Sequence, residues 1–521
     1  MSQTEVKLHE IRPLMRTQRL THPFQMDDLE NDASEVLLLV RFLKNSLAPI
    51  NRIPVEVLSL IPEYCDEGYA DQALITLTHV CHSWRDVLIS CSSLWTTLDL
   101  VNVEKMRTYI ERSKSSPLRI HLYEDRDDGA NYLYDAFSLV IPHIPRLKSL
   151  VIDADVFPDI LEHFRCHVPF LERLSVDIAA RYLDRDSRLF DGDLPSLREL
   201  ALRGVGVRLP WNNMANLRVL ELAACPPGND VTRLLDLFES SPLLQRVELL
   251  GSIPKSSNAP PERIVPLPHL TNLGIHADRP HSILLNHLRV PTGASVSQWF
   301  YFGGTKSPLL DYLPAPSTNL MNISHTTTVK LRFDSKEKFV KLSGPSGSLN
   351  VFAHWNDRET IPSYVMDRRI LRSLDTSIFS TVRELSISEY MHPNPADVNK
   401  CPVYQTLSST GDLRTLVLTR CNTKPFILAL NPGKDRSKLV LSPNLEELVL
   451  RVKSRDQLYI KRLIRMTENR ASRGTRLSSI TITSPGEIVT EKEVLRLRRF
   501  VIRVEIRADD ASNAWDDRQQ W

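Results

Sequence analysis

The sequence feature that most constrains this chain is a short pattern, Leu-x-x-Leu-x-Leu, with apolar replacements, that recurs along most of its length. It begins at residues 147, 171, 197, 217, 244 and 270, at intervals of 20–27 residues, and again at 382, 413, 445 and 477, at intervals of 31–32. The end of each copy alternates apolar and polar residues, which predicts a half-buried strand. Because a lone strand cannot bury its apolar face, the 521 residues are predicted to stack these copies around a shared, elongated core.

The segments between the copies predict helices that return the chain to the next strand, for example at 230–241 and 456–474. Cys225 and Cys421 each follow the last apolar residue of a strand by three positions, where leucine-rich repeats usually carry Asn or Cys. The period and these cysteines resemble an irregular leucine-rich-repeat solenoid, an α/β fold of parallel strands with returning helices. We expect this array to span 101–507.

Two parts of the array depart from the regular pattern. Region 278–378 is irregular, and its segments 325–333 and 347–355 predict the strands of two degenerate units, with a loop at 343–348. The last strand is expected within 498–510, where Ile502, Val504 and Ile506 alternate with charged residues and cap the array. The polar tail at 508–521 is expected to be mobile.

The N-terminal region has a different pattern. Residues 1–24 show no periodicity and predict a mobile arm, whereas 25–48 predicts an amphipathic helix. Its apolar stripe consists of Leu29, Val36, Val40, Leu43 and Leu47. We expect this stripe to pack on the next domain, because a self-associating coiled coil would need more heptads.

Residues 78–100 concentrate two tryptophans and two cysteines in a short segment. Cys81, Trp84, Leu88 and Cys91 are spaced as one face of a helix, which predicts a packed helix with buried free thiols. A zinc site would need paired ligands such as Cys-x2-Cys, and this region has no such spacing.

Three separate motifs in 49–100 together resemble an F-box. They are IPVEVL at 53–58, VCHSWR at 80–85 and LW at 94–95, in the order and spacing of that family. Ile53 replaces the usual Leu, and residues 64–72 lengthen the first connection. The resemblance is closest to the F-box proteins abundant in mushroom-forming fungi, which also carry a Leu-rich helix before the box.

This resemblance implies a function in protein ubiquitination. The box of such proteins binds a Skp-type adaptor, and through it a cullin and RING subunit, while the repeats hold a protein target (the SCF type of ubiquitin ligase). The resemblance places adaptor contacts at Ile53, Pro54, Val57, Leu58, Ile61 and Trp84. For Trp95 we favour a structural role that ties the box to the first repeat. A non-ligase F-box protein and a plain repeat scaffold remain alternatives.

The target is expected on the outward positions of the strands. The candidates are Glu199, Arg203, Glu221, Arg246, Glu248, Val417, Glu447, Val449 and Arg451. Their mixture of both charges with small apolar side chains indicates a protein target. With 65 basic and 63 acidic residues, the chain offers no electrostatic reason to bind nucleic acid or an anionic membrane.

The sequence carries no motif with a catalytic mechanism, so we expect no enzymatic activity and no cofactor. His163 and His167, with Cys166 beside them, are spaced as a metal pair on a helix, but a helix face with chance polar residues is the favoured interpretation. The absence of a long apolar run and of a secretory signal, with seven scattered cysteines, favours the cytosol or nucleus.

Overall fold

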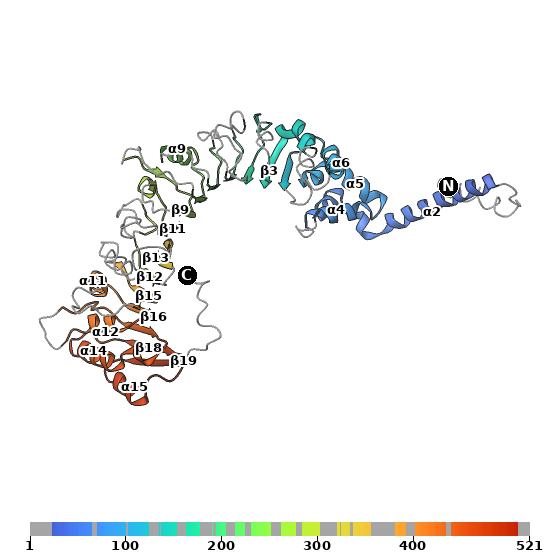
Figure 1. The fold of residues 1–521 in the computed structure, drawn as a ribbon. Helices are drawn as coiled ribbons and strands as arrows, with labels where there is room; N and C mark the ends of the chain where they lie inside the picture. Colours follow the sequence, from blue (N-terminus) through green and yellow to red (C-terminus); the bar gives the residue numbers. More distant parts are fainter. Residues whose placement is uncertain are drawn as a thin grey trace. The chain divides into compact units, whose positions relative to one another are not determined.

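The computed structural model forms two compact units, residues 1–153 and 154–521, each considered by itself below. Together they are a mixed α/β structure with a large, mostly parallel sheet (Figure 1). Residues 1–22 of the predicted arm (1–24), residues 509–521 of the predicted tail (508–521) and Cys225 lie outside the residues that the structure describes, whereas residues 23–24 begin a helix. Those residues are 23–64, 70–99, 103–123, 135, 137–153, 163–177, 190, 194–204, 214–224, 231–251, 262–277, 284–302, 320–323, 325–333, 337–355, 381–391, 402–433 and 439–508.

The first unit begins with helices and ends with three parallel strands, β1, β2 and β3, paired in that order. Its helical part consists of α2 (Pro23–Leu47), η1 (Pro49–Arg52), α3 (Val55–Leu60), η2 (Ile61–Tyr64), α4 (Ala70–Thr78), α5 (His82–Ser90) and η4 (Ser92–Trp95). Then follow β1 (Thr97–Asp99), α6 (Val103–Ser113), β2 (Leu118–Tyr123), η5 (Ile141–Arg146) and β3 (Leu147–Asp153).

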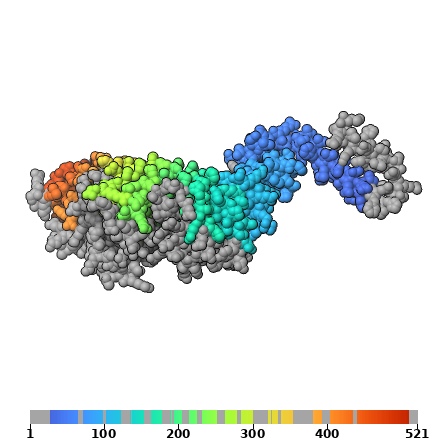
Figure 2. Space-filling view, turned by 90° about the horizontal axis from the view of Figure 1, so that it is seen from above, coloured from blue at the N-terminus to red at the C-terminus, as the bar shows by residue number. Residues whose placement is uncertain are grey.

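Helix α2 confirms the predicted helix within two residues but not its packing. Val40, Leu43 and Leu47 are 48%, 48% and 69% exposed. The helix extends away from α4 and α5 (Figure 1), and its atoms appear in dark blue in Figure 2. The extended backbone at Ala48 and Ile53, on either side of η1, separates α2 from the following helices. The stripe is therefore not part of a core in this structure.

The short helices around α3, α4 and α5, which we call the box, enclose a small core. Leu58, Leu74, Trp84 and Leu88 are all buried there. The indole Nε1 of Trp84 donates a hydrogen bond to the Asn51 side chain, so its polar atom is satisfied. Pro54, immediately before α3, suits a helix start because its missing N–H has no partner there in any case.

Trp95 joins the box to the next helix of the same unit. Its side chain is 1% exposed, and its Nε1 donates to the carbonyl oxygen of Leu88 at 2.9 Å. Its ring meets the Tyr109 ring edge to face at 4.9 Å, and the Arg112 guanidinium lies over it at 4.3 Å. Because both of these partners lie on α6, Trp95 fixes the end of α5 against α6.

The second unit contains the long sheet. Its strands pair in the order β4, β5, β6, β7, β9, β11, β14, β13, β12, β15, β16, β17, β18 and β19. The first six are β4 (Arg173–Asp177), β5 (Glu199–Arg203), β6 (Val219–Ala223), β7 (Arg246–Leu250), β9 (Asn272–Ala277) and β11 (Ser295–Phe302). The central ones are β12 (Thr328–Phe333), β13 (Glu337–Ser343), β14 (Ser348–Trp355) and β15 (Glu384–Ser388). The last are β16 (Thr415–Thr419), β17 (Glu447–Arg451), β18 (Ser479–Ser484) and β19 (Arg503–Ala508); β8 (Val265–Pro266) and β10 (Leu288–Arg289) pair separately.

Region 278–378 differs from the predicted pair of degenerate units. The predicted strands are present as β12 and β14, but the structure has two further strands in this region. Strand β11 pairs with β14, and the antiparallel strand β13 lies between β14 and β12. The predicted loop at 343–348 is the hairpin turn from β13 to β14, where the Gly344 N–H donates to the Gly347 carbonyl at 2.9 Å. A Cβ at Gly347 would lie 2.2 Å from the Thr292 carbonyl oxygen, so this turn needs glycine.

The parallel strands pair in register, which aligns their inward side chains. Leu200, Leu220 and Val247 lie opposite one another on β5, β6 and β7, and each is at most 1% exposed. The same alignment joins Leu416, Leu448 and Ile480 on β16, β17 and β18. Continuous apolar columns thus replace the round core of an ordinary domain.

Helices return the chain between several strands. They are η6 (Leu285–His287), α9 (Thr232–Ser240), α11 (Pro402–Ser409), α12 (Lys424–Leu430), α13 (Arg455–Leu458), α14 (Ile460–Ser472) and α15 (Glu491–Arg498). Helices α11, α12, α14 and α15 contact one another in that sequence, as a layer beside the last strands (Figure 1).

The predicted helix at 456–474 is interrupted at Tyr459, whose φ of 46° is left-handed. At the predicted cap, Val504 is buried, but Ile502 and Ile506 are 70% and 38% exposed.

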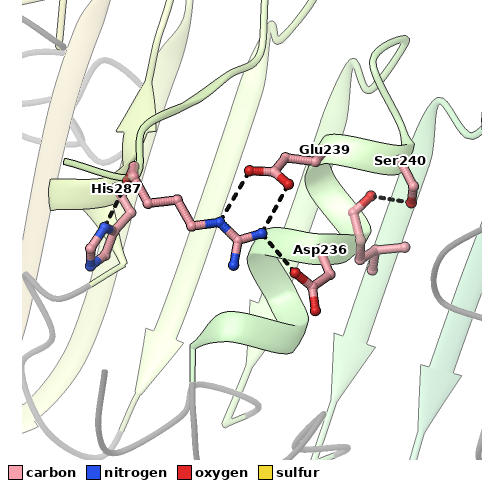
Figure 3. Close-up of polar contacts among 6 residues, drawn as sticks. Asp236, Glu239, Ser240 and His287 are labelled. Carbon is pink, nitrogen blue, oxygen red and sulfur yellow. Dashed lines mark hydrogen bonds and ion pairs between the residues drawn. The ribbon is translucent and has the colours of Figure 1, made fainter. Parts of the chain in front are cut away.

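Arg263 shows how a returning helix is fixed to the next turn of the chain. Its Nε donates to Glu239 at 3.1 Å, and its Nη2 donates to Asp236 at 2.6 Å, both on α9 (Figure 3). Hydrogen bonds to these two carboxylates raise the pKa of the guanidinium. Its carbonyl oxygen lies 2.9 Å from Nδ1 of His287, which connects α9 to the segment before β10.

Replacing Trp95 by Ala should destabilise the first unit by about 3–5 kcal/mol, because it removes a buried ring and its hydrogen bond to Leu88. Urea denaturation, followed by hydrogen exchange of peptides from α5 and α6, measures this. The control is Tyr64→Ala, which removes an aromatic side chain that is 86% exposed and should change stability by no more than about 0.5 kcal/mol. Equal effects of the two substitutions would contradict the role given to Trp95.

Candidate functional site

The box presents an apolar surface on its outer side, although it also has a buried core. Ile50, Val55, Val57, Leu60 and Tyr64 are 50%, 54%, 48%, 44% and 86% exposed. They come from η1, α3 and η2, within one short stretch of chain. We call these five residues the box surface. Several exposed large apolar side chains on so small a unit are typical of a docking site for another protein.

The structure divides the predicted adaptor-binding residues into two groups. Val57 belongs to the box surface. Pro54 is also exposed, and Ile53 and Ile61 are half-buried, so these three adjoin that surface in the chain. Leu58 and Trp84 are only 4% and 6% exposed, so they support the surface from beneath rather than form it. The family resemblance placed these two among the adaptor contacts. It did not include Ile50, Val55, Leu60 and Tyr64, which are exposed.

The second candidate surface is the outward face of the sheet in the second unit. On β5, β6, β16 and β17, every second residue is buried and the residues between them are half-buried or exposed. All predicted target-binding residues occupy these outward positions: Glu199, Arg203, Glu221, Arg246, Glu248, Val417, Glu447, Val449 and Arg451. The structure places the first five on β5–β7 and the last four on β16 and β17. The central strands separate the two sets.

Ion pairs run along the first set from strand to strand. Arg173 Nε donates to Glu199 at 2.6 Å, and Arg203 Nε donates to Glu221 at 3.1 Å. Arg203 also lies 3.9 Å from Asp177. Arg173, Glu199, Arg203 and Asp177 are about half exposed and Glu221 is 28% exposed, so each pair contributes at most about 1 kcal/mol to stability. Their regular arrangement orders the charged side chains on this face.

The central strands carry a row of aromatic side chains that sequence reasoning missed. His276, Trp299, Phe352 and Phe339 occupy aligned positions on β9, β11, β14 and β13. The His276 and Trp299 rings stack at 4.1 Å, the Trp299 and Phe352 rings at 4.9 Å, and Phe352 meets Phe339 at 4.5 Å. We call these four residues the aromatic row. Its signal was hidden because β11 and β13 do not carry the leucine pattern.

Glu248 lies at one end of the aromatic row, over Gly274. A Cβ built at Gly274 would lie 1.7 Å from Oε2 of Glu248, so the carboxylate occupies the space that any other residue would fill. Oε2 also lies 3.9 Å from Nε2 of His276. Burial lowers the pKa of His276, so its ring is neutral at pH 7 and this contact is not an ion pair at that pH. Burial, and then the charge of Glu221, raise the pKa of Glu248.

The residues considered for metal binding do not form a site in the described parts of the chain. Residues 163–170 form turns rather than the predicted helix, so His163 and His167 do not share a helix face. Cys81 and Cys91 flank α5 and are partly exposed rather than buried. Cys421 is buried, its thiol donates to the Ile387 carbonyl at 3.2 Å, and burial raises its pKa to about 12, as expected for a structural thiol. No group of three or more potential metal ligands occurs among the described residues.

Comparison with known proteins adds no assignment: no family model matches the chain, and no curated protein is significantly similar to it. Within the described residues, no helix is both long and apolar enough to cross a bilayer.

The raised pKa of Glu248 predicts a pH-dependent effect of Glu248→Gln. The carboxyl of the unfolded chain titrates near 4.5, and the folded pKa lies above that value, so ionisation above this range costs the folded state free energy. The amide removes this cost. We expect a higher melting temperature than that of the unchanged chain at pH 7, and no difference below pH 4.5, where the carboxyl is protonated in both states.

Thermal denaturation of the variant and the unchanged chain, at pH 7 and below pH 4.5, measures this effect. The control is Glu468→Gln, at an exposed position on α14. A lower melting temperature of Glu248→Gln at pH 7 would show that the ionised carboxylate stabilises this face and would contradict the prediction.

Proposed function

We propose that this chain is the substrate receptor of an SCF-type cullin ubiquitin ligase. In this proposal the helices of 49–100 are an F-box that binds a Skp-type adaptor, and the strands of the second unit are an irregular leucine-rich-repeat solenoid that binds a protein target. The chain transfers no ubiquitin itself. It raises the local concentration of the target near the ubiquitin-loaded enzyme that the cullin and RING subunit bring.

The observation that carries the proposal is the box surface. Its five side chains are 44–86% exposed, whereas Leu58 and Trp84 beneath them are buried and fix the short helices. Burying one large apolar side chain in an interface contributes about 1.5–3 kcal/mol to the binding free energy. Several such side chains together can therefore exceed the entropic cost of association. The first box motif, at 53–58, falls on α3, which carries part of this surface, and the other two fall on α5 and η4 of the same helical region. This favours an F-box over an unrelated apolar patch.

The outward face of the sheet supports the second half of the proposal. It displays ordered charges of both signs and small apolar side chains, whereas the opposite face supplies the buried columns. Mixed charge with apolar contact area is typical of protein recognition. An SCF ligase acts in the cytosol or nucleus, so the proposed role places the chain in one of these compartments.

Val57→Glu should abolish adaptor binding without unfolding the box. Val57 is 48% exposed, so the carboxylate remains solvated in the free chain but would be buried without a partner in the complex. We expect the full-length chain to recover a Skp-type adaptor and its cullin from an extract, and the variant to recover neither. Quantitative affinity purification measures this, with circular dichroism to confirm folding.

The matched control is Leu495→Glu, which introduces the same charge at a 56%-exposed apolar position on α15. It should recover the adaptor as the unchanged chain does. Leu58→Ala is a poorer test, since Leu58 is buried and its loss would also unfold the box. Recovery of the adaptor without cullin would support an F-box protein outside the ligase, and recovery of neither by the unchanged chain would leave a repeat scaffold.

A further inference from the structure

Helix α2 carries a continuous apolar face that the rest of the chain leaves open. Its residues follow one another at alternating steps of four and three, the spacing by which a helix presents one side to a partner helix. We call these six residues the α2 seam: Leu29, Ala33, Val36, Val40, Leu43 and Leu47. Leu29 and Val36 are half-buried and the other four are exposed.

The flanks of the α2 seam are apolar at its centre. Leu37, directly after Val36, and Leu39, directly before Val40, are 50% and 36% exposed. Because successive helical residues are rotated by about 100°, these two leucines border the seam on its two sides. The open apolar face is therefore wider than the seam itself.

The charges of α2 are divided between its two ends. Residues 27–35 contain five acidic residues and no basic one, whereas residues 36–47 contain Arg41 and Lys44 and no acidic one. Two copies of α2 packed in the same direction would place acid beside acid, and these charges repel. Packed in opposite directions, the acidic end of each copy lies beside the basic end of the other. The charge distribution thus favours an antiparallel pair.

One antiparallel register satisfies both the α2 seam and the charges. When residue 38 of the two copies lies at the same level, the seam residues meet in three kinds of layer, each formed twice by symmetry. The layers are Leu29 with Leu47, Ala33 with Leu43, and Val36 with Val40. On one flank, Glu30 of each copy lies beside Lys44 of the other, so two ion pairs border the seam.

The composition of α2 argues against a lipid surface as the occupant of this face. A helix that lies on an anionic membrane carries Lys and Arg along its polar side, whereas α2 carries five acidic and two basic residues. A second copy of α2 supplies both the apolar face and the opposite charges that this helix needs.

We propose that two copies of this chain associate through an antiparallel pair of α2 helices, which buries the α2 seam and pairs Glu30 of each copy with Lys44 of the other. The seam is about 27 Å long from Leu29 to Leu47, a short contact, so the dimer dissociates on dilution. A dimer carries two sheet faces, so a target with two recognition segments gains avidity. The pairing itself does not depend on the proposed function.

Sedimentation velocity of the full-length chain at increasing concentration tests the pairing. We expect a dimer fraction that rises up to roughly 100 μM, a range that detects a dissociation constant of that size. Val40→Glu should abolish the dimer, because it places a carboxylate inside the seam. Val40 is 48% exposed, so the free chain stays folded, which circular dichroism confirms.

The matched control is Leu38→Glu, which introduces the same charge on the opposite side of the same helix. Leu38 is 62% exposed and lies half a turn away from the centre of the α2 seam. This variant should dimerise as the unchanged chain does. Val57→Glu, which removes the proposed adaptor contact, should also dimerise normally.

Charge reversal tests the direction and register of the pair. Glu30 and Lys44 are about 21 Å apart along one helix, so they meet only between antiparallel copies. Glu30→Lys and Lys44→Glu should each weaken dimerisation at least about fivefold, because two attractive contacts become repulsive. The double variant should restore it, and a mixture of the two single variants should form the mixed dimer. In a parallel pair, Glu30→Lys would instead strengthen dimerisation.

A monomer at every concentration, a dimer that survives Val40→Glu, or equal losses in Val40→Glu and Leu38→Glu would each overturn the inference. A double charge variant no stronger than the single variants would overturn the antiparallel register. If the unchanged chain dimerises but recovers no adaptor, the ligase proposal fails and the α2 pair stands. If it recovers adaptor and cullin but stays monomeric, only the α2 pair fails.

Discussion

In-register pairing of the parallel strands is the constraint on which the rest of the second unit depends. When parallel strands pair without a register shift, equivalent residues of successive strands lie side by side across the sheet. Inward Leu, Ile and Val side chains then form continuous columns, as in Leu200, Leu220 and Val247. The same register aligns the outward residues, so that Arg173 meets Glu199 and His276 meets Trp299. A slip by one residue would exchange the two faces.

Much of the repeat region was predictable because burial and alternation leave a clear signal in sequence. The copies of the leucine pattern in the second unit became strands, and every predicted outward residue is on the less buried face, for example Glu248 and Val449. The central region was not predictable by the same means. The sequence of β11, SVSQWFYF, does not alternate apolar and polar residues along its length, and β13 runs antiparallel because of a glycine turn, so neither strand follows the repeat.

The box shows the opposite limitation. The family resemblance placed adaptor contacts at Leu58 and Trp84, which the structure buries as part of the core. A docking surface consists of the apolar residues left over when the core is complete, such as Val55 and Leu60. Sequence alone does not distinguish those residues from core. The exposed α2 helix illustrates the same point, since its amphipathic pattern predicted a packed face that the structure leaves open.

The central claim is that one end of the chain holds a shared adaptor while the strand face stays available for a target. Hydrogen exchange of the full-length chain, alone and with a Skp-type adaptor bound to its cullin, tests this most directly. We expect slowed exchange in the segment 49–64 and unchanged exchange in β5–β7, β9, β11 and β14. Unchanged exchange in 49–64, or protection of those strands by the adaptor complex, would contradict it.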